Sequence, residues 1–120
     1  MNIKVVKSNY ITRVIINEPN TYNSLSFKNL DDLIKIFKKL DNDKQTKVII
    51  LEGAGKGFSA GHNLKEVKGL KKRKKYLKLF NLCSKLMLQI VEGRKPVIAK
   101  VHGAAYAAGC QLAASCDLAY

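Results

Sequence analysis

The chain has 120 residues, 47% of them hydrophobic and 26% charged, and 22 Lys and Arg against 9 Asp and Glu give a formal net charge of +13 at pH 7. This composition excludes an intrinsically disordered chain, and the length fits one domain. No apolar run approaches the roughly 18 residues that span a bilayer, so we expect no membrane span. The positive charge favours an anionic partner, such as nucleic acid, an acidic membrane surface or a phosphorylated cofactor, although a Lys-rich proteome alone would produce it.

The N-terminus has neither a long apolar stretch after its first Lys nor the Arg- and Ser-rich composition of a transit peptide. We therefore expect a cytoplasmic protein, or a mitochondrial one if a eukaryotic presequence is missing. The three cysteines, Cys83, Cys110 and Cys116, form no Cys-x-x-Cys motif, and only two histidines are present. This pattern predicts free, buried thiols in a reducing compartment and argues against a zinc site, so no metal is expected.

The first half of the chain predicts a hairpin, a helix and a buried strand. Residues 3–7 and 11–16 are short β-branched runs separated by a turn signal, as in a hairpin. Ser26 can cap a helix that ends near residues 41–43, and its apolar positions recur with helical spacing. The apolar positions are Leu30, Leu33, Ile34, Phe37 and Leu40. Residues 48–51 form a continuous apolar run, which is typical of a strand buried on both faces.

The second half predicts a helix from near residue 73 to 91 with Gly93 as its stop, and a third buried strand over residues 97–101. A lysine-rich segment precedes this helix, and a long segment of small residues follows the third strand. Strand, loop and helix alternate, which indicates an α/β domain without an internal repeat. The abrupt, apolar end of the chain suggests that sequence is missing downstream.

Two of the buried strands run into loops of Gly, Ala and Ser, at residues 58–63 and 103–111. Ligands of open α/β sheets bind outside the carboxyl ends of the strands, and small residues let them approach the backbone. Two N–H groups that converge on one carbonyl oxygen would form an oxyanion hole. The alternatives are a flexible surface loop and a tightly packed core helix. A phosphate-binding P-loop is excluded, because Lys56 is not followed by Ser or Thr.

Several motifs occur in the order found in one known family. The segments FSAGHNLKE at residues 58–66, KPVIAKVHG at 95–103 and AGCQLAASCD at 108–117 resemble the crotonase (enoyl-CoA hydratase/isomerase) superfamily. The early INEP and NSL segments are similar to its N-terminal signature. Within the superfamily, CSKLM at 83–87 and the segment around residue 110 most resemble the enoyl-CoA hydratase domain-containing protein 3 group.

The resemblance implies an α/β, crotonase-type (ClpP/crotonase) spiral of β-β-α units. Residues 1–120 would be the N-terminal portion of a single crotonase-fold domain, truncated before the C-terminal helical region. It also implies an oxyanion hole made by the backbone N–H groups of His62 and Ala108, with glycine common in the family at position 108. A helix dipole at this point would favour negative charge. The implied substrate- and CoA-binding positions are Ala60, Gly61, Lys65 and Gly109.

One departure from the family concerns Gln111, which stands where hydratases have a glutamate, while their second glutamate would lie beyond Tyr120. Hydration requires positioned proton transfers, and an amide can orient water but does not titrate near neutrality. The residues therefore support thioester binding and enolate stabilisation but not a complete hydratase, and a helix-capping or packing role for Gln111 is the alternative. The imidazole of His62 is expected to be structural or substrate-facing, and His102 to be a strand-end residue.

The leading hypothesis is an acyl-CoA-binding, hydratase- or isomerase-like protein of fatty acid metabolism, assembled as a homotrimer or hexamer. Coenzyme A would enter as part of the thioester substrate, with no permanently bound cofactor. A non-catalytic acyl-CoA-binding or assembly protein is one alternative, and an RNA-binding crotonase homologue is another. The RNA-binding lysines would be Lys28, Lys35, Lys38, Lys39, Lys44 and Lys47. The lysines of residues 65–78 would instead meet the phosphates of coenzyme A.

Overall fold

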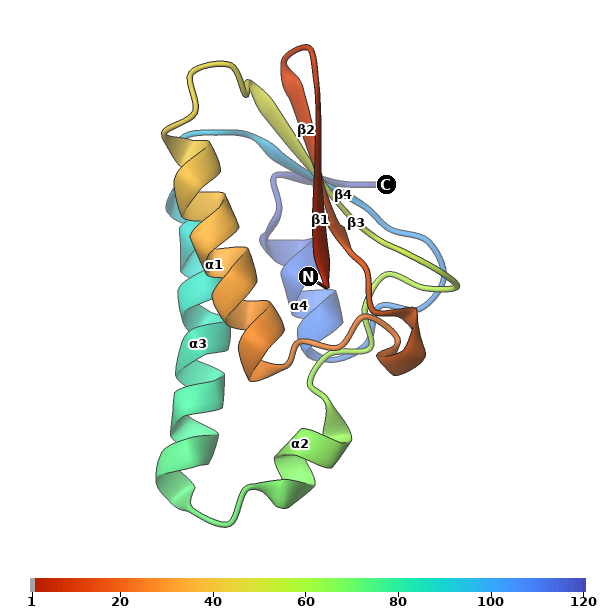
Figure 1. Ribbon diagram of the computed structural model, residues 1–120, viewed down its shortest axis with the longest axis vertical. Helices are drawn as coiled ribbons and strands as arrows, with labels where there is room; N and C mark the ends of the chain where they lie inside the picture. Colours follow the sequence, from red (N-terminus) through yellow and green to blue (C-terminus); the bar gives the residue numbers. More distant parts are fainter. Residues whose placement is uncertain (1) are drawn as a thin grey trace.

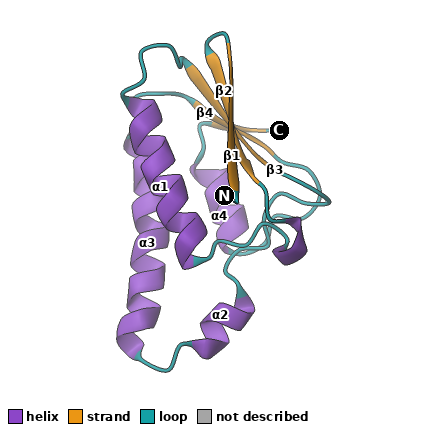
Figure 2. Ribbon diagram, viewed as in Figure 1, coloured by secondary structure: helices purple, strands orange, loops and turns teal. Residues whose placement is uncertain are grey.

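A single mixed sheet organises the chain in the computed structural model, which describes residues 2–120 (Figure 1). The strand order is β1-β2-β3-β4-β5. The strands are β1 (Ile3–Ser8), β2 (Ile11–Ile16), β3 (Val48–Gly53), β4 (Val97–Lys100) and β5 (Leu118–Ala119). The helices are the 3-10 turn η1 (Pro19–Thr21), α1 (Phe27–Asp41), α2 (Leu64–Gly69), α3 (Arg73–Glu92) and α4 (Ala108–Ser115). Helices α1 and α3 lie side by side, and α4 packs against α3 (Figure 2).

The predicted hairpin is confirmed: β1 and β2 pair antiparallel, whereas every later neighbour in the sheet is parallel. Asn9 makes the hairpin turn with a φ of 55°, a left-handed conformation that Asn tolerates better than most residues. The parallel strands require the chain to cross back along the sheet, and helices make these crossings. The carboxyl ends of β3 and β4 therefore lie next to each other at one edge.

Repeating β-β-α units follow from a short pairing beyond these two strands. Ser59, in the segment after β3, forms a parallel bridge with Ala105, in the segment after β4. The first segment then leads into α2 and the second into α4. The N–H groups of Phe58 and Ser59 both donate to the carbonyl of Ala104, at 2.9 and 3.2 Å. The β-β-α arrangement expected from the sequence is thus present, and it places the two small-residue loops in contact.

The predicted helices form because of the signals identified in the sequence. The Ser26 hydroxyl accepts the N–H of Asn29 at 3.1 Å and so caps α1. The apolar stripe of α1 is buried, as expected, in Leu30, Leu33, Ile34, Phe37 and Leu40. Helix α3 ends at Gly93, as predicted, but for a different reason. The φ of Gly93 is −64°, and a Cβ there would lie 2.9 Å from the carbonyl oxygen of Gln89, so close approach favours glycine.

The structure corrects three local expectations. Helix α2 was not predicted, because its lysines hide any apolar periodicity, and the Asn63 side chain caps it by accepting the N–H of Lys65 at 3.0 Å. Strand β3 is not buried on both faces. The helices cover one face of the sheet, and Ile50, which points to the other face, is partly exposed. The thiols are free, but Cys110 is exposed rather than buried. Among residues 2–120, no helix is both long enough and apolar enough to cross a membrane.

Candidate functional site

A cleft of about 920 Å³ lies between α3 and α4, and it brings together three of the residues singled out in the sequence. Its lining residues are His62, Phe80, Cys83, Ser84, Met87, Leu88, Ala107, Ala108, Gln111, Ala114 and Ser115. His62 comes from the loop after β3, and Ala108 is the first residue of α4, after β4. The two small-residue loops therefore meet at one apolar cleft.

The backbone N–H groups of His62 and Ala108 are the distinctive polar feature of this cleft. Within residues 2–120, neither N–H has a hydrogen-bond acceptor. Ala108 is in the first turn of α4, where a helix offers its N–H groups no partner. The adjoining backbone turns sharply at both places, with a φ of +87° at Gly61 and of +49° at Ala107. Both donors are consequently free to bind a ligand.

Gly61 brings the two donor-bearing segments into contact. A Cβ on Gly61 would lie 3.0 Å from the carbonyl oxygen of Tyr106 and 3.1 Å from the backbone nitrogen of Ala108. Only glycine combines this approach with the positive φ. The same two segments are also joined by a hydrogen bond, in which the N–H of Tyr106 donates to the carbonyl oxygen of Ser59 at 3.0 Å. The start of α4 is thus docked directly on the loop that carries His62.

The imidazole of His62 forms part of the cleft wall. Its Nδ1 lies 3.4 Å from the carbonyl oxygen of Leu25. Its ring meets that of Phe80 edge-on, with centroids 5.4 Å apart and an interplanar angle of 74°. These contacts fit the expected structural or substrate-facing role of this side chain. His102 lies outside the cleft, where its Nε2 is 2.7 Å from the carbonyl oxygen of Gly55.

Gln111 faces the cleft from α4 and is exposed. In the described part of the chain its side-chain amide makes no hydrogen bond, and α4 has no side-chain cap. The alternative interpretation, a capping or packing amide, is therefore not what the structure has. An exposed amide at the cleft surface can hold a water molecule but cannot accept a proton near neutrality.

The expected substrate- and CoA-binding positions lie within three residues of His62 or Ala108 in the sequence, but none of the four lines the cleft. The N–H of Ala60 donates to the carbonyl oxygen of Tyr22 at 2.9 Å. Lys65 is exposed on α2, three residues after His62. Gly61 and Gly109 are buried between the two donor-bearing segments.

Sequence reasoning missed the wall that α3 contributes. Phe80, Ser84 and Leu88 are exposed on α3 and face the cleft, together with the partly buried Met87. Their spacing of three to four residues forms a second stripe beside the buried one at Leu79, Cys83, Leu86 and Ile90. This second stripe was the sequence signal that could have predicted the part of the cleft wall formed by α3, but the neighbouring lysines made its periodicity hard to recognise.

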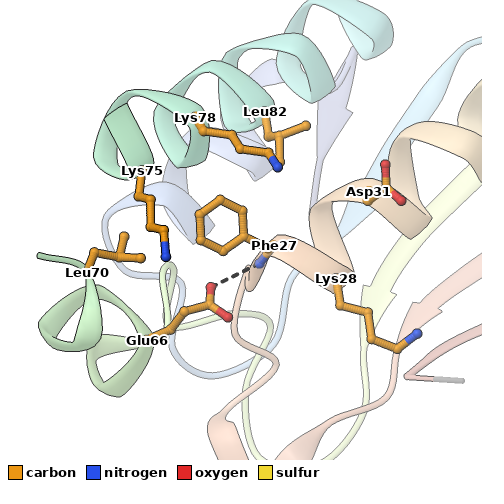
Figure 3. A pocket seen from close by; sticks show the side chains of 8 residues that line it. All are labelled: Phe27, Lys28, Asp31, Glu66, Leu70, Lys75, Lys78 and Leu82. Carbon is orange, nitrogen blue, oxygen red and sulfur yellow. Dashed lines mark hydrogen bonds between the residues drawn. The ribbon is translucent and has the colours of Figure 1, made fainter. Parts of the chain in front are cut away.

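The lysine-rich segment lines a second cavity, of about 590 Å³, where α1, α2 and α3 meet (Figure 3). Its apolar side chains are Phe27, Leu70 and Leu82, and its charged ones are Lys28, Asp31, Glu66, Lys75 and Lys78. The Glu66 carboxylate accepts the N–H of Phe27 at 3.0 Å, so it ties α2 to α1. Lys35, bonded to Asp31 at 2.8 Å, lowers the pKa of that carboxyl.

Comparison with known proteins gives a consistent assignment. Residues 6–120 match the sequence model of the family described as Enoyl-CoA hydratase/isomerase. Enoyl-CoA hydratase domain-containing protein 3, mitochondrial, from Xenopus laevis is 43% identical over 109 residues, which are 91% of this chain and 37% of that protein. The chain therefore spans little more than a third of that relative.

Two crystal structures show the same fold. An enoyl-CoA hydratase from Mycobacterium smegmatis superimposes with a TM-score of 0.96 at 40% identity, over 99% of this chain and 47% of that one. Human enoyl-CoA hydratase domain-containing protein 3 gives 0.94 at 37% identity, over 99% and 47%. The crotonase-type fold predicted from the sequence is confirmed. The chain belongs to the enoyl-CoA hydratase/isomerase family.

Proposed function

We propose that the cleft between α3 and α4 binds an acyl-CoA thioester whose carbonyl oxygen accepts hydrogen bonds from the N–H groups of His62 and Ala108. The observation that carries this proposal is the pair of unpartnered N–H groups on two adjoining segments at one cleft. An N–H left without a partner in a water-poor site is costly, so a ligand that supplies an acceptor gains affinity there. The apolar side chains of Phe80, Met87 and Leu88 suit an acyl chain.

The chemistry follows from where negative charge would develop. Hydrogen bonds to the thioester oxygen withdraw electrons from the carbonyl, which acidifies the neighbouring carbon and stabilises its enolate. A positioned donor of this kind contributes roughly 3 to 4 kcal/mol to lowering a barrier. The N-terminus of α4, whose dipole is positive at Ala108, adds to the stabilisation. Gln111 would orient a water molecule at this centre, but it supplies no base.

The nucleotide end of coenzyme A would lie along Ala60 and Lys65, with its phosphates near the lysines of residues 65–78. These lysines are exposed on α2 and at the start of α3, and α2 begins two residues after His62. Trimeric or hexameric assembly and a role in fatty acid metabolism are parts of the same proposal. A mitochondrial location is supported by the printed name of the Xenopus relative. The amide at Gln111 favours the second candidate, a protein that binds acyl-CoA without completing a reaction.

The test compares two ligands that differ at the proposed contact. Calorimetric titration with acetoacetyl-CoA and with free coenzyme A measures the gain in affinity due to the acyl group, and the ultraviolet band of the enolate reports its ionisation. We expect tighter binding of the thioester and a growing enolate band. Equal affinities would contradict the proposal. Tighter binding without an enolate band would favour the non-catalytic candidate.

Ala108→Pro removes one donor at the first position of α4, the helix position at which proline is most often found. The variant should bind free coenzyme A like the wild type but lose the gain for acetoacetyl-CoA. Thermal unfolding checks that the variant is folded. If it is not, the amide-proton shift of Ala108 in the wild type, measured with each ligand, decides the same point.

A further inference from the structure

A buried polar side chain outside the cleft is hydrogen-bonded to the loop that carries His62. Asn23 lies between η1 and α1, is 0% exposed, and has a φ of 56°. Its Nδ2 donates to the carbonyls of Ala54 at 2.7 Å and Gly57 at 2.9 Å, and its Oδ1 accepts the N–H of Glu18 at 2.9 Å. The side chain thus joins two points of the glycine-rich loop after β3 to the segment after β2.

The backbone carbonyl of Asn23 continues this connection towards the proposed donors. It accepts the Ser59 hydroxyl at 2.8 Å, and the Ser59 oxygen in turn accepts the N–H of Gly61 at 3.2 Å. Gly61 immediately precedes His62. The carbonyl of Ser59 also accepts the N–H of Tyr106, two residues before Ala108. One chain of hydrogen bonds therefore runs from Asn23 through Ser59 to both donor-bearing segments.

We propose that Asn23 is a positioning residue that, through Ser59, sets the separation of the His62 and Ala108 N–H groups; this inference rests on the proposed function. The loop contains Gly53, Gly55 and Gly57, which leave its backbone free to adopt many conformations. Stabilisation of an oxyanion requires donors that are fixed before the ligand arrives. A carboxamide alone supplies two donors and one acceptor of the required kind in one buried side chain.

Two variants separate the side chain from the backbone. Asn23→Gly keeps the positive φ without strain but loses the bonds to Ala54 and Gly57, whereas Asn23→Asp keeps the shape and presents an acceptor to two carbonyls. Asn9→Gly is the matched control, because Asn9 also has a positive φ of 55° but lies in the exposed hairpin turn. Each protein is titrated with acetoacetyl-CoA and with free coenzyme A, alongside its thermal unfolding.

We expect the preference of the wild type for acetoacetyl-CoA over coenzyme A to fall by about tenfold or more in Asn23→Gly and Asn23→Asp, the size of loss found when the hydrogen-bond partners that orient metal ligands are removed. Asn9→Gly should keep the preference. Ser59→Ala, which cuts the connection with less effect on the loop, should lower the preference in the same direction. A folded Asn23→Gly or Ser59→Ala protein with the wild-type preference overturns the positioning role while leaving the proposed function intact. If the wild type itself shows no preference, both fail.

Discussion

Gly109 packs directly on the backbone of Ser59. A Cβ on Gly109 would lie 2.8 Å from the carbonyl carbon of Ser59, and closer still to its oxygen. The first turn of α4 therefore rests on the strand-like segment that leads to His62, and no side chain fits between them. The proposed donor at Ala108 is held in place by this contact, one residue away.

Gly109→Ala is expected to push α4 away from Ser59 and to lower the free energy of unfolding by about 1 to 3 kcal/mol, the usual cost of inserting a methyl group into a packed site. Urea denaturation measures the change. Gly69→Ala is the control, because a Cβ on Gly69 in α2 meets nothing within 4 Å. If Gly109→Ala and Gly69→Ala have the same free energy of unfolding, the contact between Gly109 and Ser59 does not contribute to stability.

Ala107→Gly is expected to stabilise the fold. Ala107 has a φ of 49° and a ψ of −118°, a conformation that glycine adopts without the strain imposed by a Cβ. Release of this strain should raise the free energy of unfolding by about 1 kcal/mol. Ala114→Gly, within α4, should instead lower the free energy of unfolding by up to about 1 kcal/mol. Thermal unfolding of both variants checks the two opposite signs, and a loss of stability in Ala107→Gly would refute the strain.

Stability in acid should depend on Asp43. Hydrogen bonds from Lys7 first, and then from Thr46 and the Gln45 N–H, lower the pKa of this carboxyl from 3.8 to about 2. The unfolded chain therefore takes up a proton at a higher pH than the folded one, so the stabilisation present above the ordinary pKa is lost as the pH falls through about 2.

Asp43→Asn should accordingly be less stable than the wild type near neutral pH, and its melting temperature should fall less steeply between about pH 4 and about pH 2, the interval set by the two pKa values. Thermal melts across this interval make the comparison. Parallel curves for the two proteins would show that the bonds around Asp43 do not contribute.

Gln111→Glu should introduce a base into the cleft. The carboxylate would face the acyl carbon beside the polarised carbonyl, so the exchange of that carbon's protons with deuterated solvent should accelerate by at least about a hundredfold, a common gain from a positioned base. The exchange should also become pH-dependent, because protonation removes the base. Mass spectrometry of butyryl-CoA measures it. Gln111→Met has a similar volume and should leave the exchange unchanged, and equal rates for all three proteins would place Gln111 outside the reaction.

Local sequence signals predicted the elements that depend on nearby residues. The stripe from Leu30 to Leu40 and the cap at Ser26 define α1 because both act within a few residues. Helix α2 was missed because its lysines hide any apolar periodicity, and its bond from the Phe27 N–H to Glu66 joins segments far apart in the sequence. Strand β5 was missed because it has two residues and exists only through pairing with β4.

In the candidate site, too, the features carried by local motifs were predicted, and the contacts between distant segments were not. The motifs around His62 and Ala108 identified both segments, because small residues and their order carry a strong family resemblance. Spacing alone did not reveal that Gly61 touches the Ala108 nitrogen, since that contact depends on the crossing between β3 and β4. The NSL segment at residues 23–25 was identified only as part of the family resemblance, and the hydrogen bonds from the Asn23 side chain to Ala54 and Gly57 were not predicted, because they join segments far apart in the sequence.

The most direct measurement follows the backbone amide protons of His62 and Ala108 by NMR while the ¹⁵N-labelled protein is titrated with acetoacetyl-CoA and, separately, with free coenzyme A. If the two N–H groups bind the thioester oxygen, both signals should move downfield with acetoacetyl-CoA and much less with coenzyme A. Neighbouring amides that are already bonded, such as that of Gly61, should move little with either ligand. The same small shifts with both ligands, or a shift at only one of the two amides, would contradict the oxyanion site.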